Sequence, residues 1–294
     1  MHSKQIWGYV FIILLNTFFL SVANAEEPLE YYSSENILKF ADHLMNQRDY
    51  LRAAGEYQRY LFYQPKEKEE INYRIALCYR FGGQTEKAID SFREYLKEFP
   101  VSKYASNAYY QIGVSHFLMQ RFEETAKYLN TSIPNITDVR FKTESQQLIG
   151  LSYLMQRQWH TAENVFNKLQ QSEILSVREK AKAYSQYATQ GTNLPTRSPF
   201  LAGFLSTIVP GTGRLYTGRV GDAFTSLILV GLTGWQTYDG FNRDGITSAK
   251  GWTLGTLGTI FYVGNIYGSV ISARIYNREI TEEFLSGLSI ELVY

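Results

Sequence analysis

The segments RDYLRAAGEYQRYLFYQP (residues 48–65) and GQTEKAIDSFREYLKEFP (residues 83–100) are two copies of one helical pattern. A third copy begins with QRFEETAKYLN at Gln120 and a fourth with RQWHTAENVFNKL at Arg157, so the copies are spaced by 35, 37 and 37 residues. In each copy an aromatic residue or threonine stands three residues before a small residue or threonine, namely Tyr50 and Ala53, Thr85 and Ala88, Phe122 and Thr125, and Trp159 and Ala162. A period of this length predicts stacked helical hairpins.

A companion helix is expected before each copy. Ile75-Ala76 with Tyr79, Ile112-Gly113 with His116, and Ile149-Gly150 with Tyr153 recur 37 residues apart, and Phe40-Ala41 with Leu44 fits as the earliest member. Pro65 and Pro100 should end the second helix of their pairs, because proline cannot continue a helix. A single hairpin cannot bury its apolar face alone, so the hairpins must stack to form a core.

The period and residue placement resemble the tetratricopeptide repeat over about residues 33–170. Residues 92–129 are similar, more narrowly, to envelope members of that family, including the helical lipoprotein of outer-membrane barrel assembly and the periplasmic cell-division coordinator that binds Tol proteins. The resemblance implies a helical solenoid that binds a peptide or another protein. This chain departs from it at Pro134, which interrupts the third copy, and in having no lipid-bearing cysteine.

In arrays of this family the first helix of each pair lines the concave face. The resemblance therefore places six partner-binding side chains on that face: Tyr73, Arg80, Asn107, Tyr110, Phe117 and Gln147. Tyrosine and arginine suit peptide binding because each combines a large contact area with a polar tip. For Tyr110 and Phe117 the alternative is packing between neighbouring repeats. A polar helix over Val177–Ala188 is expected to cap the last hairpin.

The N-terminus predicts export. Residues 1–25 have a basic start, an uncharged apolar run from Ile6 to Val22, and the sequence Ala23-Asn24-Ala25, which is typical of signal peptidase cleavage after Ala25. An uncleaved anchor helix is the alternative, since the run is almost long enough to span a bilayer. We therefore expect the repeat domain, residues 26–190, in the periplasm of a bacterial cell envelope.

Charge and chemistry exclude several classes of protein. Lysine plus arginine total 29 against 28 acidic residues, so the chain lacks the basic surplus of a nucleic-acid-binding protein. The single cysteine, Cys78, permits neither an internal disulfide nor a cysteine-based metal site, and the four histidines share no metal-binding spacing. No hydrolase or metalloprotease motif is present. The sequence therefore predicts no catalytic residue, no metal, no cofactor and no enzymatic activity.

Composition changes at a predicted linker, residues 191–197. Of 22 glycines, 7 precede residue 198 and 15 follow it, and glycine is common where helices pack inside lipid. The runs Ala223–Tyr238 and Trp252–Ile271 contain no charge, and the second would cover about 30 Å as a helix. We expect a transmembrane domain over residues 198–275 and a C-terminal tail over residues 276–294.

The same residues bear on how this domain crosses the membrane. The run Phe200–Val209 is short for a span, but its crossing would place Arg214 and Arg219 on the cytoplasmic side, as the positive-inside rule requires. The alternative for the whole region is a buried helical hairpin of a soluble protein. Two G-x-x-x-G spacings, at Gly251 and Gly255 and at Gly264 and Gly268, would allow homo-oligomers to form through the spans.

The short run leads into PGTGRLYTGRVGDA, residues 210–223. Proline and glycines predict a tight turn here, with arginine and tyrosine beside lipid headgroups. The pattern is similar to the signature of small bacterial membrane domains of the TM2-like kind, a resemblance that implies no established chemistry. A phosphate-binding loop would need a preceding strand and Gly-Lys-Ser/Thr, which are absent. The motif residues are Pro210, Gly211, Gly213, Arg214, Tyr216, Gly218, Arg219 and Asp222.

These observations predict an all-α protein, a tetratricopeptide-like solenoid of helical hairpins followed by a small α-helical membrane domain. The predicted function is a scaffold tethered to the cytoplasmic membrane that binds a peptide or envelope protein during envelope assembly or membrane protein insertion. The alternative is a small transport or lipid-handling unit regulated by the repeats, for which Asn265, the Pro210 turn and Arg214 are the candidate residues.

Overall fold

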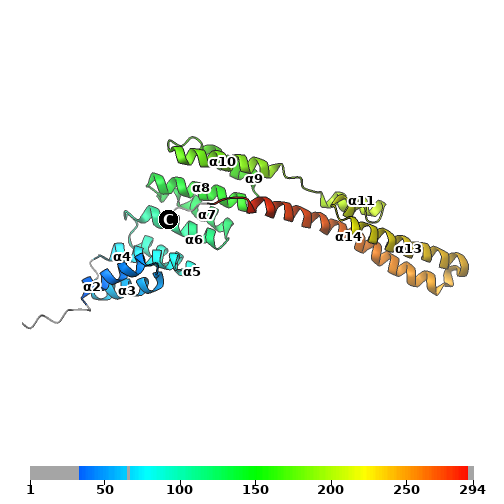
Figure 1. The fold of residues 1–294 in the computed structure, drawn as a ribbon, viewed down its shortest axis with the longest axis horizontal. Helices are drawn as coiled ribbons and strands as arrows, with labels where there is room; N and C mark the ends of the chain where they lie inside the picture. Colours follow the sequence, from blue (N-terminus) through cyan, green and yellow to red (C-terminus); the bar gives the residue numbers. More distant parts are fainter. Residues whose placement is uncertain (1–32, 65–66, 291–294) are drawn as a thin grey trace, which may run out of the picture. The chain divides into compact units, whose positions relative to one another are not determined.

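A computed structural model of the chain describes residues 33–64 and 67–290 (Figure 1). The predicted signal peptide therefore lies outside the described residues. Every regular element in the described part is a helix, which confirms the all-α prediction there. Successive hairpins are formed by α2 (Ser34–Asn46), α3 (Tyr50–Tyr63), α4 (Lys68–Phe81), α5 (Thr85–Glu98), α6 (Ala105–Leu118), α7 (Phe122–Ser132), the short η2 (Ile133–Asn135) and α8 (Val139–Met155).

The chain divides into two compact units between Leu148 and Ile149, within α8. The second unit continues with α9 (Trp159–Leu169), α10 (Leu175–Thr192), α11 (Pro199–Ile208), α12 (Thr212–Tyr216), α13 (Val220–Asp244), η3 (Gly245–Thr247) and α14 (Ala249–Ser286). The predicted linker at residues 191–197 thus lies inside the second unit, where the chain leaves α10 and enters α11.

The turn inside each hairpin repeats with the period of the sequence. Its central residue has a left-handed backbone in all four copies, with φ values of 63°, 77°, 58° and 63° at Arg48, Gly83, Gln120 and Arg157. The next N–H donates back to the carbonyl five residues earlier, as in Gln84 to Tyr79 (2.9 Å), which is the helix-ending arrangement known as the Schellman motif. The same bond returns to Leu44, His116 and Tyr153, so the companion residues of the sequence pattern are the residues that close these turns.

Each hairpin is packed by a small residue on its first helix and a large one, 16 residues later, on its second. The pairs are Ala41 and Tyr57, Ala76 and Phe92, Gly113 and Leu129, and Gly150 and Phe166. In the two glycine pairs, a β-carbon would come within 2.6 Å of the Leu129 or the Phe166 side chain. The large side chain occupies the space that the missing β-carbon leaves, and this allows the two helices to approach closely.

Two glycine substitutions test this packing. Gly113→Ala should destabilise the fold by about 1 kcal/mol, because the new methyl group displaces the buried Leu129 side chain. Gly55→Ala, also in a helix interior but with open space around its β-carbon position, should stabilise it by about 0.5–1 kcal/mol through helix propensity. Urea unfolding followed by far-UV circular dichroism measures both changes. Shifts of the same sign for the two variants would contradict the packing described.

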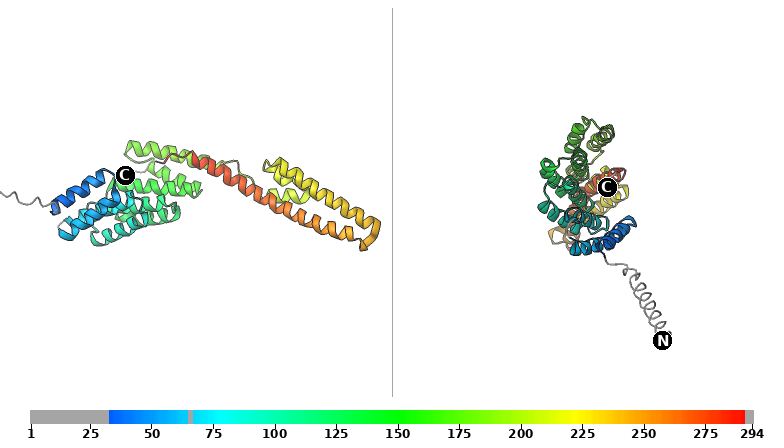
Figure 2. Two further views of the ribbon diagram at one scale, coloured as in Figure 1. Left: turned by 60° about the horizontal axis from the view of Figure 1, so that its bottom comes forward. Right: turned by 90° about the vertical axis from the view of Figure 1, so that its left-hand side faces the viewer.

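The helices of the C-terminal part bury small and polar residues and expose large apolar ones. In α13 and α14, which run side by side in Figures 1 and 2, the buried residues include Ala223, Ser226, Asn265 and Ser269. Trp235 and Ile260 are 62% and 61% exposed, and further large apolar side chains are exposed at Phe200, Phe224, Leu227, Ile228, Val263 and Tyr267. This distribution is typical of helices that pack through small residues and turn their apolar faces to lipid. By length and composition, α14 could cross a membrane.

Helix α14 extends beyond the end predicted for the membrane domain and continues to Ser286. The amide side chain of Asn277 holds the backbone of Arg197, accepting from its N–H (2.6 Å) and donating to its carbonyl (2.8 Å). Further along, the ring of Phe284 stacks on Tyr187 of α10, with 4.1 Å between centroids. Most of the described part of the predicted tail is therefore a packed continuation of α14.

Candidate functional sites

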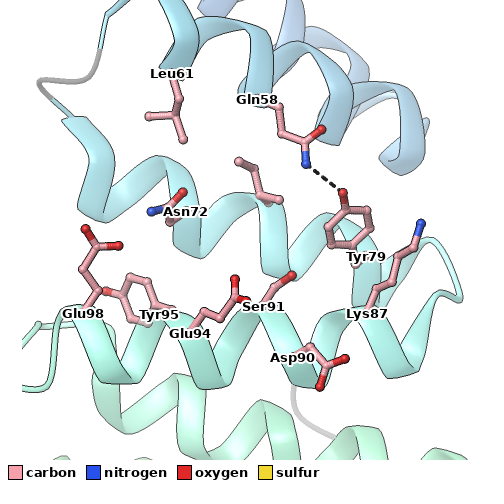
Figure 3. A pocket seen from close by; sticks show the side chains of 11 residues that line it. Gln58, Leu61, Asn72, Tyr79, Lys87, Asp90, Ser91, Glu94, Tyr95 and Glu98 are labelled. Atoms are coloured by element: carbon pink, nitrogen blue, oxygen red, sulfur yellow. Dashed lines mark hydrogen bonds between the residues drawn. The ribbon is translucent and has the colours of Figure 1, made fainter.

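A groove on the first unit is lined by three consecutive helices (Figure 3). Its volume is about 420 Å³. Helix α4 contributes Asn72, Ile75 and Tyr79, and α3 contributes Gln58 and Leu61. Helix α5 contributes Lys87, Asp90, Ser91, Glu94, Tyr95 and Glu98. Because α3 and α5 are the second helices of their hairpins, the groove lies between two neighbouring repeats and over the helix that joins them.

Two contacts order one end of the groove. The amide of Gln58 donates to the hydroxyl of Tyr79 at 2.9 Å, which joins α3 to α4. The ammonium group of Lys87 lies 5.6 Å from the centre of the Tyr79 ring, a cation–π contact from α5. The Tyr79 side chain is therefore held at its hydroxyl by α3 and at its ring by α5, and it offers a half-buried aromatic surface.

The other wall of the groove is acidic. Asp90, Glu94 and Glu98 follow each other at intervals of four residues on α5, so they lie on one face of the helix. Glu98 pairs with Lys68 at 2.5 Å and Asp90 with Arg93 at 3.6 Å, whereas no ion pair forms at Glu94 within the described part of the chain. Because Lys68 and Arg93 already balance two of the three carboxylates, Glu94 is the acidic group that makes this wall complementary to a positively charged residue with an apolar neighbour.

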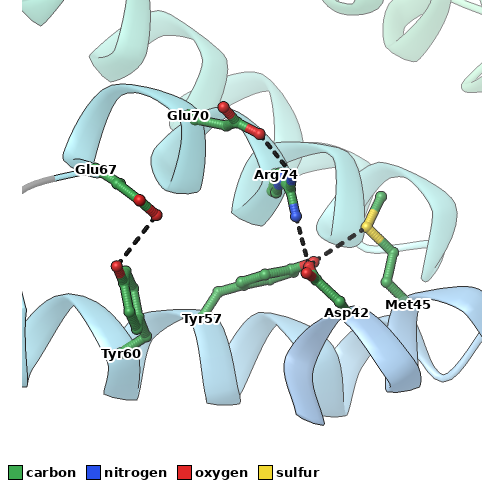
Figure 4. A network of polar contacts seen from close by, with 7 residues as sticks. All are labelled: Asp42, Met45, Tyr57, Tyr60, Glu67, Glu70 and Arg74. Carbon is green, nitrogen blue, oxygen red and sulfur yellow. Dashed lines mark hydrogen bonds and ion pairs between the residues drawn. The ribbon is translucent and has the colours of Figure 1, made fainter. Parts of the chain in front are cut away.

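A second polar cluster joins α2, α3 and α4 (Figure 4). Arg74 pairs with both Asp42 and Glu70 at 2.5 Å, and the Tyr57 hydroxyl donates to Asp42 at 2.6 Å. The bond to Arg74 holds the pKa of Glu70 below its usual value, while burial and the bond to Asp42 raise the pKa of Tyr57. These groups are hydrogen-bond and ion-pair partners of one another, so we interpret the cluster as a structural contact that joins the first two repeats.

Most of the side chains predicted to line the concave face are buried. Tyr73 stacks on Tyr104 with 4.5 Å between ring centres, and its hydroxyl accepts a hydrogen bond from the amide of Asn107. The ring of Tyr110 contacts Phe141 of the next repeat, which is the packing alternative considered for it, whereas the ring of Phe117 contacts Phe122 of its own hairpin. The buried residues are Tyr73, Arg80, Tyr110, Phe117 and Gln147, with Asn107 half-buried. Their role in partner binding stays a prediction, and a bound partner would first meet their exposed neighbours.

His116 shows what burial does to a titratable group in this unit. Burial lowers its pKa, the positive charge of Arg93 acts in the same direction, and the largely exposed Glu124 carboxylate, 3.7 Å from Nδ1, opposes the shift without reversing it. The folded-state pKa therefore lies below the unfolded value of 6.5. The stabilising contribution is present above that value and is lost as pH falls through the folded-state pKa.

The substitution His116→Gln should therefore make stability less dependent on pH. We expect the wild type to lose stability relative to the variant as pH falls from about 8 to about 5, because the unfolded wild type binds a proton that the folded form resists. Urea unfolding at a series of pH values measures this difference. If the difference in unfolding free energy between wild type and variant is the same at every pH, the lowered pKa of His116 in the folded state is contradicted.

Two other possibilities for the described residues are a reactive cysteine and a metal site. Cys78 is buried, and burial raises the pKa of its thiol to about 12, so the reactive thiolate is disfavoured. Among the residues described, no group of three or more histidine, cysteine, aspartate or glutamate side chains could hold a metal ion.

The glycine-rich motif forms a turn fastened to α14. Gly211 has a φ of 90°, and its N–H donates to the Asn265 side chain at 3.0 Å, while the Asn265 amide donates to the Ser206 carbonyl at 3.2 Å. The N–H of Gly213 donates to the Ser206 hydroxyl at 3.0 Å, which also bonds to Ser269 at 2.7 Å. The motif therefore docks the end of α11 and the start of α12 on the middle of α14.

The other motif residues lie at the edges of this turn. Gly218 ends α12 with a φ of 80°, and the Tyr216 hydroxyl accepts from the N–H of Ser198 at 3.3 Å. Arg219 and Asp222 form an exposed pair at 3.5 Å. Pro210 precedes the Gly211 turn, and Arg214 extends from α12 against Gly268 of α14.

The glycines of the two G-x-x-x-G spacings face atoms of this same chain at three of four positions. A β-carbon at Gly251 would approach the Phe241 ring to 2.7 Å and one at Gly255 would approach Thr237 to 3.1 Å. One at Gly268 would collide with Arg214, and Gly264 alone of the four has open space. Homo-oligomer formation through these spacings stays a prediction.

Comparison with known families places a tetratricopeptide repeat in the first unit. Residues 71–102, which comprise most of α4 and all of α5, match the tetratricopeptide repeat. Among curated proteins no relative of the chain was found. The matched segment supplies nine of the eleven residues that line the groove. The match and the consecutive helical hairpins together support a tetratricopeptide-repeat protein, a fold that is generally non-catalytic and serves protein–protein interaction.

Proposed function

We propose that the protein is a scaffold of the bacterial cell envelope, in which the repeat unit binds a peptide or protein partner in the periplasm and the C-terminal helices hold it to the cytoplasmic membrane. The partner would be engaged in envelope assembly or membrane protein insertion. The observation that carries the binding function is the groove between α3 and α5, with the ring of Tyr79 at one end. On its wall lies Glu94, whose carboxylate has no ion-pair partner among the residues that the structure describes. The lipid-facing pattern of α13 and α14 supports the tether.

Site-specific photocrosslinking of the full chain in cells tests the groove. A photoreactive residue at Ser91, which lines the groove, should give one defined adduct, and one at Lys97, exposed on the same helix outside the groove, should not. The added substitution Glu94→Lys should abolish the adduct from Ser91, because it reverses the charge of the acidic wall. Adducts from Lys97 that match those from Ser91 would refute the groove as the binding surface.

Alkaline carbonate extraction of membranes tests the tether separately. The full chain should stay with the membrane pellet, because carbonate removes peripheral proteins and leaves integral ones in place. Release of the intact chain into the supernatant would show that α13 and α14 form a hairpin of a soluble protein.

A further inference from the structure

A second cavity lies wholly within the second unit, among α12, α13 and α14, and has a volume of about 350 Å³. Arg214 projects into it from α12. The surface of the cavity is otherwise mainly apolar, with Leu229 and Val230 from α13 and Ile260 and Phe261 from α14. The cavity therefore brings one guanidinium group together with an apolar wall.

Arg214 has no anionic partner among the described residues. Its Nε is buried with no hydrogen-bond partner, and within the described part of the chain no carboxylate lies within ion-pair distance of it. Three other arginines of this unit do have a carboxylate partner: Arg219 pairs with Asp222, Arg243 with Asp239 and Arg278 with Glu282. A partly buried guanidinium without a counter-charge is costly, so an anion that enters the cavity gains a strong partner there.

The other polar groups of the cavity do not satisfy the arginine. The hydroxyls of Thr225 and Ser226 donate to carbonyl groups of their own helix, at 3.0 and 2.9 Å. The side chain of Asn265 is engaged by Gly211 and Ser206. Gly268 has no side chain, and this leaves space for the guanidinium, because a β-carbon there would collide with it.

We infer that this cavity binds the phosphate head of an anionic lipid. A planar guanidinium matches the geometry of a phosphate with two parallel hydrogen bonds, and the cavity presents it as the only cationic group. Leu229 and Ile260 are also exposed on the outer faces of their helices, so the apolar wall is continuous with the surface that an acyl chain would contact. The lipid as the source of the phosphate rests on the proposed membrane tether. The cavity itself is independent of the groove on the repeat unit.

Native mass spectrometry of the full chain in neutral detergent tests the inference with phosphatidic acid and phosphatidylcholine as probes. The wild type should retain one phosphatidic acid molecule with an affinity about tenfold higher than for phosphatidylcholine, the scale expected for a charged hydrogen-bonded pair. Arg214→Gln should abolish this preference. Arg243→Gln, at an exposed ion pair with Asp239 outside the motif, should keep it. Equal preference in the wild type and in folded Arg214→Gln would overturn the proposal.

Chemical modification of the wild-type chain gives a second measurement, which requires no variant. Phosphatidic acid, but not phosphatidylcholine, should protect Arg214 of the wild type from an arginine-specific dicarbonyl reagent, while the exposed Arg243 reacts equally in both. Protection by inorganic phosphate at the same concentration would overturn the lipid as the source of the phosphate group. If the chain stays in the membrane pellet after carbonate extraction but shows no preference for phosphatidic acid, only this lipid site is refuted. If carbonate releases the chain, the membrane tether is refuted.

Discussion

Phe92→Ala should lower the free energy of unfolding of the repeat unit by about 3–5 kcal/mol. The Phe92 side chain is fully buried, and its ring lies 6.1 Å from that of Tyr73. It is also the large partner of Ala76 in the second hairpin, and both belong to one buried cluster with Ile89. The substitution would leave a cavity in the core of the second hairpin, and the loss would spread because each repeat depends on its neighbours for stability.

The matched control for this prediction is Phe62→Ala. Phe62 is 82% exposed on α3, so removing its ring should change the stability by about 0.5 kcal/mol or less. Urea unfolding of the full chain in neutral detergent, followed by far-UV circular dichroism, compares the two variants with the wild type. Similar losses of stability for both variants would show that the hairpin core is not packed as described.

The hairpins could be predicted because each of their determinants is local in the sequence. Proline cannot continue a helix from within, and α3 and α5 end at Tyr63 and Glu98, just before Pro65 and Pro100. Likewise α7 ends at Ser132 and the short η2 carries Pro134, which confirms the interruption of the third copy. A small residue that recurs with the repeat period similarly predicts where helices approach closely, whatever the rest of the chain does.

The groove could not be predicted in the same way, because it needs side chains from three helices. The resemblance indicates the first helix of each pair as the binding surface. On those helices, however, Tyr73 and Tyr110 are buried in contacts with the next repeat. One signal was present in the sequence, the row of Asp90, Glu94 and Glu98 on one face of a helix. A row of acids is usually a solvated face, and only the position of α3 opposite it shows that it lines a groove.

Helix α14 is longer than the apolar run Trp252–Ile271 within it, because hydropathy and helix propensity are separate properties of a sequence. The charged residues after Ile271 end an apolar run but are good helix formers, and Arg278 and Glu282 form an ion pair one turn apart at 3.8 Å. No glycine or proline occurs between Gly268 and Gly287, which caps the helix. The helix therefore continues until Gly287.

Gly213→Ala should destabilise the C-terminal helices by about 3 kcal/mol, at the upper end of the usual cost of overpacking. A β-carbon at this position would collide with the backbone carbonyl of Ala202 in α11 and lie 2.6 Å from the Ser206 hydroxyl. A backbone atom cannot rotate away as the Leu129 side chain can beside Gly113, so α12 must move off α11. That movement would also break the bond from the Gly213 N–H to Ser206 and loosen the turn held by Asn265.

Gly221→Ala is the control for this second prediction, because Gly221 lies in α13 with open space at its β-carbon position. It should leave stability unchanged or raise it by up to about 1 kcal/mol through helix propensity. Unfolding of both variants by SDS in mixed micelles, followed by far-UV circular dichroism, separates the two results. If Gly213→Ala unfolds at the same SDS fraction as Gly221→Ala, the glycine is not required for close contact between α11 and α12, and the motif must owe its sequence to something other than packing.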